Sequence, residues 1–309
     1  MLRAEFEKIW SRPFIRIAFL LVCFSQVLYT FMNYNPNLKE VEDAYENISF
    51  TEMLDEYTNR LKEVYGDYGV EAYANLREAS EQGELVFGIS PAGNIMTNQN
   101  GIALAVMVFM MILCVDLFSG EKEMGMVPMQ KVTRYGRKKL FQTKLLVCQI
   151  SACVVWVAAN LSFAITLTTV YGWGNVRSVV QDFQFNACPY NWNAGEFLIV
   201  VLICGFLASQ ITALMIFLLT YYTNNTQKAF AVMGGTMLLP YLLAFFLNNI
   251  KLAMWIPCLM NNSWLWKGLH LIRFQKTYIP MWSIAIIECI LIGIISFLIL
   301  HCMIKKQTE

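Results

Sequence analysis

The residue patterns that are typical of P-loop nucleotide binding, zinc proteolysis and paired-cysteine chemistry do not occur in this chain. The Walker A pattern G-x-x-x-x-G-K-[ST], which holds the phosphates of ATP, is absent. The two histidines, His270 and His301, lie far apart and outside the H-E-x-x-H pattern of zinc proteases. The nine cysteines have no C-x-x-C spacing, which disfavours a zinc or redox site. We therefore predict that the chain is not an enzyme, has no catalytic or metal-binding residues and binds no cofactor itself.

Polar residues inside long apolar stretches are the next candidates, because they are costly to place in hydrocarbon. They are Asp116, Asn160, Gln210 and Glu288. Asp116 lies beside a basic segment, which favours a structural ion pair over an ion-binding site. Glu288 lies about 9 Å from the nearer predicted membrane boundary, at 1.5 Å per helical residue. The sequence leaves three alternatives open for Glu288: it lines a substrate pathway, it pairs with Arg273 or Lys276, or it lies at the membrane–water interface.

Methionines recur on one helical face in two of the apolar stretches. Their side chains are flexible and adapt to varied ligands, so they are candidates for the lining of a pathway. Packing between helices is the commoner use of such residues. Together with Glu288, the predicted pathway residues are Met107, Met110, Met111, Met233, Met237 and Tyr241.

A basic segment follows Asp116 and ends at Lys144. It holds seven basic residues against two acidic ones, Glu121 and Glu123. Lysine and arginine are enriched in loops that remain in the cytoplasm. We therefore predict that this segment is cytoplasmic and that it contacts a partner protein.

Six predicted membrane spans position these residues. The 309-residue chain is 57% hydrophobic and only 15% charged, with a mean hydropathy of +0.48, whereas a soluble domain is about 25% charged. Each apolar stretch is long enough to cross a hydrocarbon layer about 30 Å thick as a helix. The sequence therefore predicts an all-α polytopic membrane protein with spans at 14–32, 100–118, 145–172, 196–222, 228–248 and 282–304.

The distribution of basic residues predicts the orientation of the spans. Segments 1–13, 119–144, 223–227 and 305–309 are predicted to be cytoplasmic, with both termini on that side of the cell membrane. Segment 33–99 carries thirteen acidic and four basic residues and is predicted to be external.

Four segments outside the spans complete the predicted layout. Residues 1–13 form an amphipathic helix on the inner membrane surface, ended by Pro13. Segment 33–99 forms a helical hairpin whose first helix is opened by Ser49 and Glu52 as a capping box. Segment 173–195 is an external loop, and the tryptophan-rich segment 249–281 forms short interfacial helices. Cys188 and Cys258 lie in external segments and are a candidate disulfide pair.

This layout resembles the permease subunits of type-2 ABC exporters over nearly the whole chain. Members of that family have an inner-surface helix, six spans, a cytoplasmic coupling helix after the second span, and interfacial helices before the sixth. Segment 33–99 is larger than in the compact drug and polysaccharide members. The residues most specific for the resemblance, similar to an E-x-x-x-G element and the basic stretch that follows it, are Glu121, Gly125, Arg134, Gly136, Arg137 and Lys144.

The resemblance implies a mechanism and a set of partners. A separate ATPase chain, which binds ATP and magnesium, would dock against the helix around 121–132. Two permease chains, identical or related, would pair within membrane lipid, and the second and fifth spans would line the pathway. No nucleic acid partner is implied. The implied ATPase-coupling residues are Glu121, Glu123, Gly125, Met126, Lys131, Arg134 and Arg137.

Two functional hypotheses follow. In the first, the chain exports an amphipathic substrate such as an antimicrobial peptide, a drug or a lipid-like molecule. In the second, it is a membrane scaffold or sensor that does not transport, whose external hairpin binds a ligand and whose basic segment binds anionic lipid. A third possibility, an intramembrane acyl- or glycosyltransferase, lacks a supporting acid–histidine motif.

Overall fold

The computed structural model describes most of the chain. The described residues are 2–32, 55–56, 58–59, 62–63, 70–71, 73–82, 100–125, 136–172, 176–182, 188–247, 250–266, 270–274 and 277–306.

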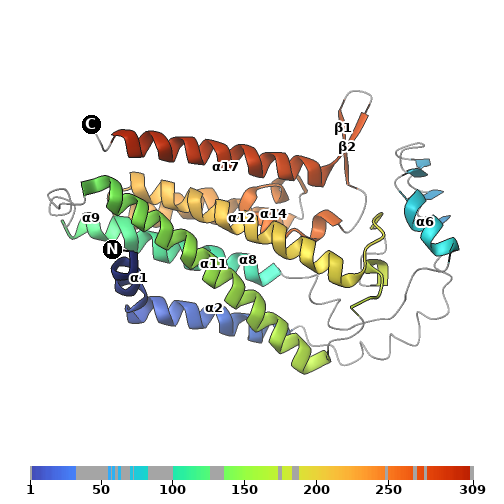
Figure 1. Cartoon of the computed structure of the whole chain (residues 1–309), viewed down its shortest axis with the longest axis horizontal. Coiled ribbons are helices and arrows are strands. Elements are labelled where there is room, and N and C mark those ends of the chain that lie inside the picture. Colours follow the sequence, from blue (N-terminus) through green and yellow to red (C-terminus); the bar gives the residue numbers. More distant parts are fainter. Residues whose placement is uncertain are drawn as a thin grey trace.

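The described chain is mostly helical, and long helices form one elongated bundle (Figure 1). Six of these helices are long and apolar enough to cross a membrane, and each coincides with one of the predicted spans. This confirms the prediction of a helical multi-pass protein. Four of the six are single helices: α2 (Pro13–Met32), α11 (Gly136–Tyr171), α12 (Ala194–Tyr222) and α17 (Met281–Lys306). The second span consists of α8 (Asn100–Val115) and the helical residues that follow it as far as Glu123. The fifth consists of α13 (Thr226–Met233), η4 (Gly234–Leu238) and α14 (Leu239–Leu247).

Helices α8, α11 and α12 form the centre of the bundle. Helix α11 contacts α2, α8 and α12, and α12 also contacts α17. In the most apolar stretch of the span that contains α8, 67% of the residues are buried, whereas in the corresponding stretch of α17 only 17% are buried. Apolar side chains lose nothing by facing lipid tails, so an exposed apolar helix is expected at the periphery of a membrane bundle. Helix α8 is therefore the innermost of the six, and α17 lies on the outside.

A glycine allows α12 to approach α11 closely. A Cβ atom at Gly205 would lie 2.7 Å from the Trp156 ring and 2.8 Å from the carbonyl oxygen of Met260. The carbonyl belongs to the backbone and the ring is almost fully buried, so neither moves aside easily. Small residues commonly mark such close helix contacts in membranes.

Replacing Gly205 with alanine is therefore expected to destabilise the bundle by about 1–3 kcal/mol, the range for an overpacked core. Gly234 is the matched control, because nothing lies within 4 Å of a Cβ at that helical position. Gly234→Ala should cost nothing or gain up to about 1 kcal/mol. Unfolding of the purified variants in mixed micelles measures the difference. Equal effects at the two glycines would contradict the packing argument.

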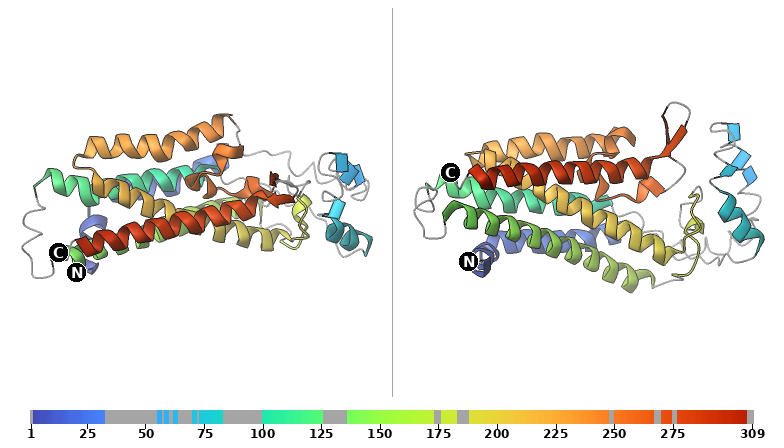
Figure 2. Two further views of the ribbon diagram at one scale, coloured as in Figure 1. Left: turned by 90° about the horizontal axis from the view of Figure 1, so that it is seen from above. Right: turned by 45° about the horizontal axis from the view of Figure 1, so that its top comes forward.

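Both termini lie at one end of the bundle, and α6 (Ala74–Glu81) lies beyond the other end (Figures 1 and 2). An even number of crossings requires the termini to share a side. Helix α6 lies in segment 33–99, for which a helical hairpin was predicted. Ser49 and Glu52, the predicted capping box, lie outside the described residues.

The basic segment is more helical than predicted. Helix α8 continues through a π-helical turn, η2 (Asp116–Gly120), into α9 (Glu121–Glu123), and α11 already begins at Gly136. The predicted third span began only at 145. Lysine and arginine are good helix formers, so the charges that mark the end of the apolar stretch do not mark the end of the helix.

The N-terminal helix packs against protein. Helix α1 (Leu2–Trp10) has the predicted amphipathic pattern, but it contacts α11 and α2. Ile9 is buried, and the Trp10 indole donates a hydrogen bond to Ser151 Oγ at 3.2 Å. The apolar side chains that we expected to face the membrane surface therefore pack largely against α2 and α11.

The segment before the last helix is not wholly helical, which corrects the all-α prediction. It contains the short helices α15 (Ile250–Ala253), α16 (Ile256–Leu259) and η5 (Ser263–Trp266). An antiparallel hairpin then follows, β1 (Leu271–Phe274) with β2 (Thr277–Pro280), in which Leu271 is opposite Pro280. Aromatic and β-branched residues in LIRF and TYIP favour strands.

In the loop before α12, η3 (Val180–Asp182) follows a bridge between Val179 and Asn193. Cys188 and Cys258 are both free thiols.

Protonation of His270, next to β1, is expected to make stability depend on pH. Burial lowers the pKa of His270, and a hydrogen bond with the backbone of Trp264 partly opposes this effect. The unfolded chain therefore takes up this proton more readily as the pH falls below about 6.5, and the folded state is destabilised. Melting temperatures at about pH 7.5 and pH 5.5 should differ less in His270→Gln than in the unmodified chain. An unchanged difference would contradict this assignment.

Candidate functional site

A buried ion cluster joins α9 to α1 and α11. The carboxylate of Glu121 is nearly inaccessible, with 2% of the residue exposed. It accepts hydrogen bonds from Lys8 Nζ at 2.5 Å and from Lys144 Nζ. Lys144 is itself 3% exposed and also donates to the carbonyl oxygen of Leu117 at 2.8 Å. Charges this deeply buried persist only when they are paired, so the three side chains hold three helices in one arrangement.

A second ion pair lies next to this cluster. Arg12, just after α1, donates to the carboxylate of Asp116, the first residue of η2. Asp116 therefore forms a structural ion pair, as expected, but its partner comes from the N-terminal segment. Single π-helical turns such as η2 often occur at functional sites.

Other contacts join α9 to the turn between α12 and α13. Lys122 Nζ donates to the carbonyl oxygens of Tyr221 and, at 2.9 Å, Thr223. These carbonyls belong to the C-terminal end of α12, where a cation is favourable. The Glu123 carboxylate accepts a hydrogen bond from Thr226 Oγ1 at 2.8 Å. The end of the second span is thus bound to the start of the fifth.

The structure describes the surroundings of three of the seven predicted coupling residues, Glu121, Glu123 and Gly125. Glu121 is buried in the cluster, whereas Glu123 is exposed beside Thr226. Gly125 ends α9 with φ +68°, a left-handed conformation that glycine adopts without strain. Met126, Lys131 and Arg134 lie outside the described residues, as does the side chain of Arg137 at the start of α11.

The N-terminal contribution to this region was not predicted. In the sequence, Lys8 and Arg12 belong to the polar face of the predicted amphipathic helix and to the basic residues that predict a cytoplasmic N-terminus. Lys144 was associated with the basic stretch but not with Glu121. The one signal available was the presence of opposite charges at the inner ends of three predicted helices, which does not specify which of them pair.

Six of the seven predicted pathway residues lie in the packed interior. They are Met107, Met110, Met111, Met233, Met237 and Tyr241, and all are buried. The methionines come from α8, α13 and η4, which contact one another. Of the other polar candidates, Asn160 donates to the Trp156 carbonyl at 2.9 Å and Gln210 is half-buried on α12.

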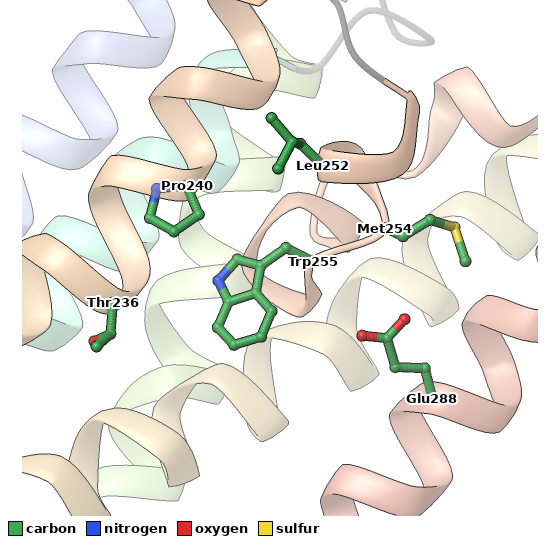
Figure 3. Close-up of a pocket in the computed structure, with 6 residues that line it drawn as sticks. All are labelled: Thr236, Pro240, Leu252, Met254, Trp255 and Glu288. Atoms are coloured by element: carbon green, nitrogen blue, oxygen red, sulfur yellow. The ribbon is translucent and has the colours of Figure 1, made fainter.

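Glu288 is the predicted pathway residue that lines a cavity. It is half-buried on α17, and its carboxylate points toward Trp255 and Met254 (Figure 3). The cavity has a volume of about 430 Å³, within the range of small-molecule sites. The side chains of Arg273 and Lys276, its proposed ion-pair partners, lie outside the described residues. The remaining lining residues, none of them predicted, are Thr236, Pro240, Leu252, Met254 and Trp255.

Comparison with protein-family models, curated proteins and solved structures gave no match. Within the described residues, no group of three or more His, Cys, Asp or Glu side chains could hold a metal ion.

Proposed function

We propose that this chain is the permease subunit of an ATP-driven exporter of the type-2 ABC class, moving an amphipathic substrate across the cell membrane. The observation that carries the proposal is the attachment of α9. This short helix is bound through Glu121 to α1 and α11, and through Lys122 and Glu123 to the turn between α12 and α13. A partner that pushes on α9 would therefore move several helices together.

The proposed mechanism follows from this attachment. A separate ATPase subunit, which binds ATP and Mg²⁺, docks against the segment after Glu121 at the cytoplasmic end of the bundle. Closure of two such ATPases displaces α9 and with it the second, third and fifth spans, a rigid-body switch between inward and outward states. Two permease chains enclose the pathway. The energy comes from the partner, because the sequence contains no P-loop.

Reversing the charge of the basic segment tests the proposal. The unmodified chain, purified in mild detergent from its own cells, is expected to bring with it a nucleotide-binding protein. Arg134→Glu combined with Arg137→Glu is expected to reduce the transport-linked ATPase activity of the complex by about tenfold, since a docking surface that carries complementary charge becomes repulsive.

The control is Lys62→Glu, at an exposed position in the segment before α6. It should leave both co-purification and ATPase activity unchanged. If no nucleotide-binding protein accompanies the chain and the double charge reversal has no effect on transport-linked ATPase activity, the exporter proposal fails. The scaffold or sensor hypothesis would then account better for the basic segment.

A further inference from the structure

The cavity at Glu288 lies between two peripheral parts of the bundle. Thr236 and Pro240 come from η4 and α14, and Glu288 comes from α17. Helix α16 contacts both α14 and α17 and so bridges them. The α13–α14 and α17 spans are the least buried of the six: 22% and 17% of the residues in their most apolar stretches are buried. The cavity therefore lies outside the packed centre formed by α8, α11 and α12.

Glu288 supplies a negative charge that the described residues do not neutralise. No ion pair or hydrogen bond joins it to another described side chain. It lies seven residues into α17, about 10 Å along the helix axis. An ionisable residue at such depth is expensive unless it serves a partner or a ligand.

The other walls suit a cation that carries apolar groups. Pro240, Leu252 and Met254 are apolar, and the ring of Trp255 stands between Pro240 and Glu288 (Figure 3). Indole is the side chain that attracts cations most strongly through its π-face. Trp255 Nε1 is buried, has no hydrogen-bond partner among the described residues and lies on the side of the ring away from Glu288 (Figure 3), so the ring, rather than this nitrogen, is the part of Trp255 that a ligand would contact.

We propose that this cavity binds the cationic group of an amphipathic molecule, with Glu288 as its counter-ion and Trp255 as its aromatic wall. The ligand's apolar part would extend toward the lipid between α14 and α17. As a statement about transported substrate, this inference rests on the proposed exporter function. As a statement about binding, it concerns this chain alone.

Two ions of the same shape and opposite charge test the site. Equilibrium binding of tetraphenylphosphonium and of tetraphenylborate is measured on the full chain in lipid nanodiscs, with binding to protein-free nanodiscs subtracted. The unmodified chain should bind the cation more tightly than the anion. Glu288→Gln should weaken cation binding by about tenfold or more, because a poorly solvated charge loses its partner. The anion should bind no more weakly than before.

Further variants separate the site from general effects. Glu288→Asp, which keeps the charge, should retain most of the cation affinity. Trp255→Leu should weaken cation binding about threefold or more, whereas Trp255→Phe should weaken it less. Glu78→Gln is the charge control, because Glu78 is exposed on α6, where its carboxylate accepts a hydrogen bond from Gln82. Elution profile and melting temperature verify that each variant is folded.

Three results would overturn the inference: no preference for the cation in the unmodified chain, unchanged cation binding in Glu288→Gln, or equal losses for both ions. The assay contains no ATPase subunit, so its outcome is independent of the proposed function. A chain that binds the cation through Glu288 but never recruits an ATPase would refute the exporter proposal and leave the binding site intact.

Discussion

Replacing Glu121 with alanine is expected to lower the free energy of unfolding by about 3–5 kcal/mol, the usual cost of breaking a buried ion pair. The substitution would leave Lys144 charged, 3% exposed and, among the described residues, with the Leu117 carbonyl oxygen as its remaining hydrogen-bond acceptor. Lys8 would suffer less, because its side chain is 36% exposed and can turn to solvent. Most of the loss therefore comes from Lys144. Unfolding in mixed micelles, followed by circular dichroism, measures it.

Glu123 provides the matched control for Glu121. It lies two residues further along, is exposed, and accepts hydrogen bonds from Thr226. Glu123→Ala should cost about 1 kcal/mol or less, as expected for a contact at the surface. Losses of equal size at the two positions would contradict the buried-cluster interpretation.

A double substitution separates the role of charge from the role of volume. Glu121→Met combined with Lys144→Met removes both buried charges while keeping apolar volume. Such replacements are often neutral or stabilising, so the double variant should recover most of the stability lost in Glu121→Ala. If it does not, the geometry of the ion pair itself is required for the bundle end to form.

The membrane spans could be predicted from the sequence because their cause is local. Long runs such as GIALAVMVFMMILCV must form helices in lipid, where every backbone amide needs a partner within its own segment. The start of α11 at Gly136 was missed for a related reason. The charges of Arg137 and Lys139 indicate where hydrocarbon ends, and they carry no information about where the helix begins.

The pairing of side chains could not be predicted, because it depends on contacts between distant parts of the chain. Lys8 and Glu121 are separated by 113 positions, and no periodicity relates them. The Glu288 cavity could not be predicted for the same reason, because Thr236 and Trp255 line it from two other parts of the chain. In contrast, the methionines on α8 were visible as a stripe, but a stripe does not distinguish a packed face from a pathway.

The second large effect is expected at Lys122, which binds α9 to the end of α12. Lys122→Met should reduce substrate transport per ATP hydrolysed by about tenfold, corresponding to about 1.4 kcal/mol of lost coupling free energy. The physical reason is that Lys122 Nζ contacts the carbonyl oxygens of Tyr221 and Thr223, whereas methionine cannot donate to them. Displacement of α9 would then no longer be transmitted through this contact to the end of the fourth span, α12.

The measurement for Lys122→Met requires the complete complex of permease and ATPase in proteoliposomes. Transport and ATP hydrolysis are recorded together, and basal hydrolysis should fall less than about twofold, because Lys122 points toward α12 and forms no part of a nucleotide site. Lys228→Met is the control: it removes the same charge from an exposed position on α13, two residues after Thr226. A parallel loss of hydrolysis and transport in Lys122→Met would indicate that the ATPase no longer docks. Unchanged transport per ATP would show that α9 acts on the bundle through its other contacts, at Glu121 and Glu123.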